Sequence, residues 1–366
     1  MSSSENKSQT SHNFHQRVRH AGRSAPIGAD DSFENFVARE IGVEAIKPED
    51  AWQSKPITLD IDGIETEIRR DYLFDEYVIV SPGRGKRPYD TSKNRHPLIE
   101  TADSPRLDKE KEVYSIKEDG EWLVKVVKNR YSALTMDNPK AHGSQELVID
   151  TPLANVPFAR LSLAQIGRVL KAYQMRTANL LSKKGIAYVL IFRNDGFEAG
   201  ASLAHAHSQI FAMPVIPKRF QDHSNQIEQY YLDKKKQPIE DIISFERSQK
   251  KRIIAEDQHF FVICPYASQY PFEAWLIPKR HVVSFDKFST SQLESCAHQL
   301  KNLTQKLTGA QISFNFFIEN GISPHYRCII KLYGRSSIWG GFEVATGMVI
   351  NTVPPESATS WYRSVK

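Results

Sequence analysis

The chain repeats one order of elements, and this duplication limits its fold more than any other feature. A long helical pattern is followed by an apolar run that ends in an Asn-Gly or Asn-Asp-Gly turn, and a segment beginning with histidine comes next. Because one strand, helix, strand unit occurs twice, the sequence predicts two similar halves. The elements occupy residues 162–185, 186–196 and 205–213 in the first copy, and residues 289–307, 312–321 and 325–333 in the second.

The predicted fold class is α/β (α+β), with antiparallel sheets and helices packed on them. Alternating apolar and polar residues around an Asp-Gly turn at 56–82 predict a hairpin. Residues 1–54 are predicted to be a mobile tail, in which residues 31–42 carry a short helical pattern. Residues 55–215 are expected to form the first half, and residues 216–366 to contain charged linker helices and the second half.

The composition is that of a soluble protein. Of the 366 residues, 40% are hydrophobic and 25% are charged, and no run approaches the roughly 20 apolar residues that span a bilayer. The first residues lack the apolar core of a secretory signal, so we expect a cytoplasmic protein with no membrane partner. The net charge of +5 is too diffuse to indicate nucleic acid binding. The three cysteines are widely spaced and predict reduced, buried thiols.

Residues 200–210, with the sequence GASLAHAHSQI, place His205, His207 and Gln209 at alternate positions. On a strand, alternate residues project from one face, about 7 Å apart. A neutral imidazole can attack a phosphorus atom, and a glutamine amide can donate a hydrogen bond to a phosphate oxygen. The small residues before the histidines would let backbone N–H groups approach a phosphate. The motif alone leaves two alternatives open, a pair of metal ligands and a pair of structural histidines.

With this motif the chain resembles the galactose-1-phosphate uridylyltransferase family, a branch of the histidine triad superfamily whose hallmark is His-x-His-x-Gln. Similar segments extend from about Arg69 to Arg363. They are RRDYLFDEYVIVSPGRGKRPYD, VVKNRYSAL, FRNDGFEAGASLAHAHSQI, PFEAWLIPKRHV, and GGFEVATG through PPESATSWYR. The resemblance implies a duplicated histidine-triad-like fold and a homodimer.

The resemblance also implies a role for individual residues. His207 would be the nucleophile that accepts a nucleoside monophosphoryl group, with His205 supporting it by hydrogen bonding and Gln209 holding the phosphate. Ser202 would act beside them in the phosphate pocket. The implied substrate-binding residues are Arg84, Arg87, Asn129, Asn194, Gly200 and Ala201.

The second copy lacks this set of residues. It carries His325 in place of His205 and Arg327 in place of His207. Because no second histidine is present, we expect His325 to be structural and the first copy alone to carry the chemistry. His281, which follows a basic segment, is also expected to be structural.

The chain departs from the family where other members bind metal. Many members hold zinc on two cysteines, a histidine after a strand and the first histidine of the motif. Here the matching segment has no cysteine, the histidine position is Ala154, and only His205 remains. A second metal site of some members would use His281 with two C-terminal histidines, and those positions are Ile329 and Lys331. We therefore expect no metal cofactor.

The resemblance predicts a nucleotidyltransferase with a covalent nucleotidyl-histidine intermediate, acting on a nucleotide sugar and a sugar phosphate. At the position where galactose-1-phosphate enzymes carry a glutamine that contacts the hexose phosphate, this chain has Val349. Its C-terminal pattern is more similar to that of ADP-glucose phosphorylase. A phosphorylase or hydrolase of nucleoside diphosphate sugars or dinucleoside polyphosphates, with inorganic phosphate or water as acceptor, is therefore the first alternative. A non-catalytic nucleotide-binding protein is the second.

Overall fold

The computed structural model describes residues 57–61, 64–82, 111–153, 156–201, 203, 205–335 and 339–364. The predictions of a mobile tail and a short helix in residues 1–54 lie outside these residues. No helix in the described part of the chain is long and apolar enough to cross a membrane.

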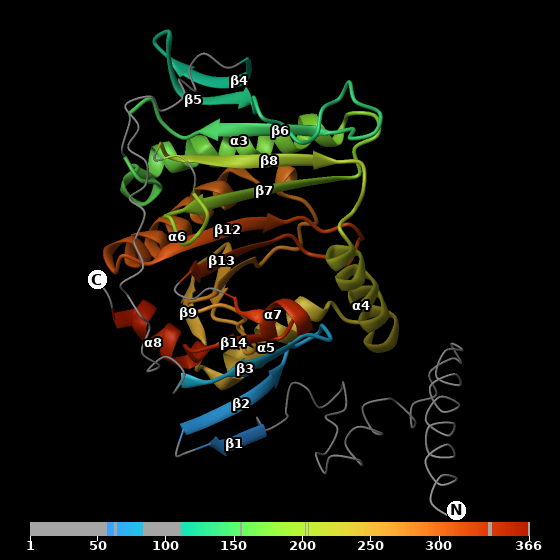
Figure 1. Ribbon diagram of the computed structural model, residues 1–366, viewed down its shortest axis with the longest axis vertical. Coiled ribbons are helices and arrows are strands. Elements are labelled where there is room, and N and C mark those ends of the chain that lie inside the picture. The colour runs from blue at the N-terminus through green and yellow to red at the C-terminus, as the bar shows by residue number, and fades with distance from the viewer. Residues whose placement is uncertain are drawn as a thin grey trace, which may run out of the picture. The chain divides into compact units, whose positions relative to one another are not determined.

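Ten strands of the described chain form one sheet, in the order β4-β5-β6-β8-β7-β12-β13-β11-β10-β9. Figure 1 shows this order from β4 to β13. Every neighbouring pair is antiparallel. The first five are β4 (Glu112–Glu118), β5 (Glu121–Lys128), β6 (Ser144–Ile149), β8 (His207–Met213) and β7 (Tyr188–Asp195). The others are β12 (Ser313–Glu319), β13 (Ile329–Arg335), β11 (Ala274–Pro278), β10 (Phe260–Ile263) and β9 (Ile253–Glu256).

The second five strands repeat the first five in mirrored order, which confirms the duplication expected from the sequence. The two half-sheets meet where β7 pairs with β12, with Phe192 opposite Phe317 and Asn194 opposite Asn315. Each half was expected to have its own sheet, and the structure instead joins them into one. The pairing satisfies the backbone groups of two edge strands that would otherwise be exposed.

Two long helices cover one face of this sheet, α3 (Leu163–Leu181) and α6 (Thr290–Gly309). Both begin at a serine whose hydroxyl accepts a hydrogen bond from the first turn, Ser162 from Gln165 N at 3.1 Å and Ser289 from Gln292 N at 3.2 Å. The sequence pattern places the end of α3 at Gly185, whereas the helix ends four residues earlier and Gly185 lies in the following turn.

Apolar side chains of both halves form a single core between the two helices and the sheet. The strand residues in this core alternate with residues on the opposite face, which we call the second face. The core residues on β5, β7, β8, β12 and β13 include Val124, Val126, Ile191, Ile210, Ala212, Phe314, Phe316, Ile318, Ile330 and Leu332.

Two further helices link the halves, α4 (Lys218–Lys234) and α5 (Pro238–Gln249), as the charged periodic segment predicted. Ile227 of α4 and Ile242 of α5 line one small cavity together with Trp275, Ile329 and Lys331 of the sheet. Ile329 and Lys331 alternate along β13 with the core residues Ile330 and Leu332, so they lie on the second face. Trp275 pairs with Lys331 and lies on the same face. The linker helices therefore cover the second face of the second half.

A separate sheet of four strands has the order β1-β2-β3-β14. The predicted hairpin is confirmed in β1 and β2, which pair antiparallel from Ile57↔Ile68 to Ile61↔Ile64. Its strands are β1 (Ile57–Ile61), β2 (Ile64–Arg70), β3 (Tyr77–Val80) and β14 (Val349–Asn351). The remaining elements among the described residues are α7 (Gly341–Thr346), α8 (Pro355–Ser364) and the short 3-10 helices η4 (Phe158–Arg160) and η5 (Phe285–Lys287).

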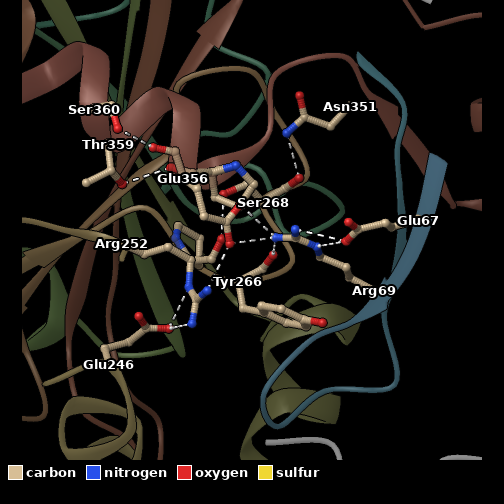
Figure 2. A network of polar contacts seen from close by, with 12 residues as sticks. Glu67, Arg69, Glu246, Arg252, Tyr266, Ser268, Asn351, Glu356, Thr359 and Ser360 are labelled. Atoms are coloured by element: carbon tan, nitrogen blue, oxygen red, sulfur yellow. Dashed lines mark hydrogen bonds and ion pairs between the residues drawn. The ribbon is translucent and has the colours of Figure 1, made fainter. Parts of the chain in front are cut away.

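Figure 2 shows the polar contacts that attach this small sheet to α8 and to the start of β9. Arg69 of β2 and Arg252, the residue before β9, donate to one carboxylate oxygen of Glu356 in α8, at 3.1 and 2.8 Å. Arg252 also donates to Glu246 of α5 at 3.0 Å, and both guanidinium groups lie over the ring of Tyr266. These ion pairs thus connect β2 to α8 and to the α5–β9 segment, which are distant from β2 in the sequence.

We expect Phe316→Ala to lower the free energy of unfolding by about 3–5 kcal/mol, because it empties a large site in the core at the junction of the halves. Phe316 is fully buried and lies opposite Arg193 in the β7–β12 pairing. Urea denaturation followed by circular dichroism measures the change. Phe342→Ala, at a side chain that is 42% exposed, is the control and should change stability by less than about 0.5 kcal/mol. Equal effects of the two substitutions would contradict the assignment of the junction to the core.

Candidate active site

His207 is the first residue of β8, and its partner across the sheet is Ile149 of β6. Gln209, two residues further on, pairs with Leu147. Ser208 between them faces α3, where its hydroxyl is hydrogen bonded to that of Tyr173. His207 and Gln209 therefore project together from the second face, as the alternation of the sequence predicted.

The hydrogen bonds of the His207 ring fix its protonation. Its Nδ1 lies 2.8 Å from the backbone oxygen of His205. Because a carbonyl oxygen only accepts, Nδ1 carries the proton and Nε2 of the neutral ring keeps a free lone pair. The residue is 6% exposed, and this burial, with the charge of Arg193 nearby, lowers the pKa of His207 below its usual value. The ring is therefore neutral at pH 7 and has a nucleophilic Nε2.

His205 supports His207, but not as a neighbour on one strand. The strand starts only at His207, so the expectation of three residues alternating on β8 is wrong for His205. Its ring Nε2 donates to the backbone oxygen of Thr151 at 2.7 Å, just beyond β6, while its own backbone oxygen accepts from His207. The predicted hydrogen bond between His205 and His207 is thus made by the backbone oxygen of His205, and not by its side chain. The imidazole of His205 holds that backbone in place through Thr151.

A buried ionic network lies beneath His207 on the helix side of the sheet. Arg193 of β7 donates to Asp150, to Ser208 Oγ at 3.3 Å and to Asp195 at 3.1 Å, and its guanidinium lies 4.5 Å from the ring of Phe158. Asp150 also donates its backbone N–H to Ala206 O at 3.1 Å. The network therefore holds the residues on both sides of His207.

The sequence predictions did not include this network. Its signal was an arginine and an aspartate within otherwise apolar strand patterns, IAYVLIFRNDG and QELVIDTP. A charge in such a run is costly unless it is paired, so it marks a buried ion pair.

Hydrogen bonds also fix the orientation of the Gln209 amide. Ala133 N donates to Gln145 Oε1 at 3.0 Å, so Nε2 of Gln145 is the end that donates to Gln209 Oε1, at 3.4 Å. Gln209 thus keeps its NH2 group as a donor on the face from which His207 projects. Gln145 was not among the predicted site residues.

Asn129 follows β5 and lies next to Gln145, whose backbone oxygen accepts from Asn129 N at 2.9 Å. Its side-chain Oδ1 accepts from Tyr131 N at 2.9 Å, which leaves Nδ2 as the remaining donor of the amide. The structure therefore brings Asn129, one of the predicted substrate-binding residues, to the same side of the sheet as Gln209.

Asn194 lies beside His207 on the adjacent strand. Phe192 pairs with Gln209, so Asn194, two residues along β7, is on the same face and level with His207. Its Nδ2 donates to Gly200 O at 3.4 Å. Asn194 is therefore placed to contact a ligand bound at His207.

The loop after β7 contains Gly200 and Ala201, two of the predicted substrate-binding residues. Their backbone N–H groups donate within the loop, to Phe197 O at 2.9 Å and Gly196 O at 3.1 Å. The sequence prediction had these small residues offering N–H groups to a phosphate, whereas in this conformation they close the loop on itself. The other predicted site residues, Ser202, Arg84 and Arg87, lie outside the described residues.

The strand register corrects the predicted correspondence between the two halves. Phe192 of β7 pairs with Gln209, and the matching Phe317 of β12 pairs with Lys331, so Ile329 and not Arg327 lies at the position of His207.

Arg327 instead corresponds to His205. It is 1% exposed and donates to Pro278 O at 3.1 Å, to Lys279 O at 3.2 Å and to Glu240 of α5. His325 bonds Glu228 of α4 at 2.7 Å. These internal contacts support the structural role expected for the second copy.

The residues of this chain do not fit the metal sites that the family resemblance implies. The Nε2 of His205 already donates to Thr151, and Cys264, Cys296 and Cys328 are buried away from it in the core of the second half. At the other site, Lys331 Nζ lies 2.7 Å from Glu319 and supplies the positive charge there. His281 Nε2 donates to Pro324 O at 2.8 Å. The residues present therefore leave both sites without the ligands that such a metal needs.

Comparison with known proteins gives consistent matches over most of the chain. Residues 110–217 match the family model of the N-terminal domain of galactose-1-phosphate uridyl transferase, and residues 223–324 match that of its C-terminal domain. ADP-glucose phosphorylase of Arabidopsis thaliana is 28% identical over 82% of this chain and 93% of its own length. Galactose-1-phosphate uridylyltransferase of Thermotoga maritima is 29% identical over 82% of this chain and 98% of its own.

The fold agrees with these matches. The crystal structure of an ADP-glucose phosphorylase from Arabidopsis thaliana with bound ADP-glucose superposes with a TM-score of 0.72, at 28% identity, and covers 82% of this chain and 99% of that one.

We expect the imidazole of His207 to titrate below pH 6.5, because burial disfavours its charged form. Nuclear magnetic resonance of the ring nitrogens measures the midpoint and should show the proton on Nδ1 at pH 7.5, with His207→Gln identifying the signal. Since the unfolded chain binds this proton more readily, His207 should reduce stability as the pH falls below about 6.5, and His207→Gln should lose less stability than wild type over that range. A midpoint at or above 6.5, or a proton on Nε2, would contradict the geometry.

Proposed function

The chain belongs to the galactose-1-phosphate uridyl transferase family, and we propose that it transfers a nucleoside monophosphoryl group through a covalent bond to His207. The observation that carries this proposal is the hydrogen bond from His207 Nδ1 to His205 O, which leaves Nε2 unprotonated on a ring that burial keeps neutral. Such a ring can attack phosphorus at neutral pH without a separate base to activate it.

In the first step, Nε2 attacks the α-phosphorus of a nucleoside diphosphate sugar. The P–N bond forms as the bond from the α-phosphorus to the bridging oxygen breaks, and the sugar phosphate leaves with the electron pair. The substituted ring is cationic, and its Nδ1 proton remains on the hydrogen bond to His205 O, which stabilises the charge. In the second step, an acceptor oxygen attacks phosphorus, the P–N bond breaks, and the neutral ring returns.

The surrounding residues bind and orient the nucleotide. Gln209 would donate its NH2 group to a phosphate oxygen, where negative charge is redistributed during transfer. Asn194 and Asn129 would contact the nucleotide, and the loop that contains Gly200 and Ala201 would lie along it. Ser202, Arg84 and Arg87 would bind phosphate oxygens.

We propose nucleoside diphosphate glucose as the donor, with sugar 1-phosphate as the acceptor, because the similar proteins are an ADP-glucose phosphorylase and a galactose-1-phosphate uridylyltransferase. A phosphorylase that uses inorganic phosphate is the second candidate. One observation favours it: Val349, at the position of the family's hexose-binding glutamine, is apolar and buried in β14 opposite Val78. It cannot hydrogen bond to a hexose phosphate. We also propose a homodimer without a metal cofactor, acting in the cytoplasm.

We expect wild-type protein incubated with ADP-glucose or UDP-glucose to gain the mass of one nucleoside monophosphate on His207, in an acid-labile bond. Intact mass spectrometry and peptide mapping measure this adduct. His207→Ala should gain none, whereas His298→Ala, at an exposed histidine of α6, should label like wild type.

Adding galactose 1-phosphate, inorganic phosphate or no acceptor to the labelled protein then distinguishes transfer, phosphorolysis and hydrolysis. If no nucleotide labels wild type above His207→Ala, the enzymatic proposal fails and the non-catalytic alternative stands.

We expect Gln209→Leu to slow adduct formation by about 100- to 1000-fold at saturating donor, because it removes a donor that faces the reacting phosphate. Rapid-quench measurement of labelled protein gives the rate constant. Gln221→Leu, on the exposed side of α4, is the control and should leave it unchanged. A rate constant within threefold of wild type would show that Gln209 does not stabilise the transferring group.

A further inference from the structure

We propose that Asn315, a residue of the second half, is a positioning residue for the site on the first half. The inference rests on the proposed function. Asn315 lies on β12 opposite Asn194 of β7, where the two half-sheets join. It does not touch His207, and it would act through the loop between β7 and β8.

Asn315 uses both donors of its amide on the first half. Its Nδ2 donates to Asn194 Oδ1 at 2.8 Å and to Ala199 O at 2.8 Å. One amide group therefore binds the end of β7 and the middle of the loop at once. Both partners are oxygen atoms that accept, so only an NH2 group satisfies the pair.

The second half also fixes which way the Asn315 amide points. Arg335 of β13 donates from Nη1 to Asn315 Oδ1 at 3.3 Å. Its guanidinium lies 5.4 Å from the ring centroid of Tyr270, another residue of the second half. Because arginine only donates, the oxygen of Asn315 faces Arg335 and the NH2 group faces the first half. With its Oδ1 occupied by Asn315, Asn194 directs its own Nδ2 to Gly200 O.

A second contact holds the start of the same loop against β12. Gly196 has a φ of +90°, and a Cβ atom at this position would lie 2.2 Å from Ser313 Oγ. Only glycine allows this approach without movement of β12. Ser313 Oγ also donates to the Glu198 carboxylate. The loop is therefore bound to β12 near its start, through Gly196 and Glu198, and in its middle, through Ala199.

The nucleophile itself is held independently of Asn315. His207 bonds His205 O, His205 bonds Thr151 O, and Ser208 bonds Tyr173 and Arg193, and all of these residues belong to the first half. Loss of Asn315 should therefore move Asn194 and the loop, and with them the bound donor, while the protonation of His207 stays the same. A misplacement of about 1 Å reduces rates by about 100-fold in well-oriented sites.

The test compares Asn315→Asp with wild type and with Asn302→Asp, which makes the same change of charge on an exposed residue of α6. In Asn315→Asp, a carboxylate oxygen faces Asn194 Oδ1 and Ala199 O, and three acceptors repel one another. We expect KM for the nucleotide donor to rise and the rate constant of adduct formation, measured per labelled His207, to fall about 10- to 100-fold. The pH midpoint of that rate should not move. Asn302→Asp should match wild type.

Counting only labelled sites separates positioning from folding, because a misfolded fraction lowers the number of sites and not their rate constant. Asn315→Ser, which loses the two-acceptor contact without adding charge, should give the same direction of change if Asn315→Asp expresses poorly. Unchanged KM and rate constant in either variant, with wild type labelling normally, would overturn the role of Asn315 alone. If wild type does not label, the proposed function fails, and this proposal fails with it.

Discussion

The pairing of β7 with β12 is the interaction on which the rest of the structure depends. It joins two similar half-sheets at strands that would otherwise be exposed edges, and it allows one core to extend under α3 and α6. It also places Asn315 opposite Asn194, so that a residue more than a hundred positions away contacts the loop before the nucleophile. The same backbone pairing thus stabilises the fold and completes the surroundings of the site.

The two halves share one architecture, but the first carries the candidate site and the second has a structural role. In the first half, His207 occupies its position with an unprotonated Nε2 and a buried ionic network beneath it. In the second half, Ile329 occupies the matching position, and Arg327, which corresponds to His205, is bound by backbone oxygens and by Glu240 of a linker helix. A buried guanidinium requires such partners, and those partners leave it no room to serve a ligand. The linker helices therefore stabilise the second copy by filling the place that the first copy uses.

Local sequence patterns predicted the features of the fold that depend on residues close together in the chain. The duplication, the two core helices, the charged linker helices and the common face of His207 and Gln209 all follow from periodicity and turn residues. The contacts of Gln145, Arg193 and Asn315 did not follow, because they depend on the register between strands that are distant in the chain. The position of His205 before β8, and the internal hydrogen bonds of Gly200 and Ala201, depend on where a strand begins and how a loop closes. The sequence pattern does not encode these details.

The continuous sheet also limits how the protein can move. Enzymes that enclose their substrates often close two lobes around a flexible connection. Here the backbone hydrogen bonds of β7 and β12 cross the boundary between the halves, and the halves cannot swing apart without breaking them. Access to His207 and release of product must therefore rely on motions that leave this sheet intact.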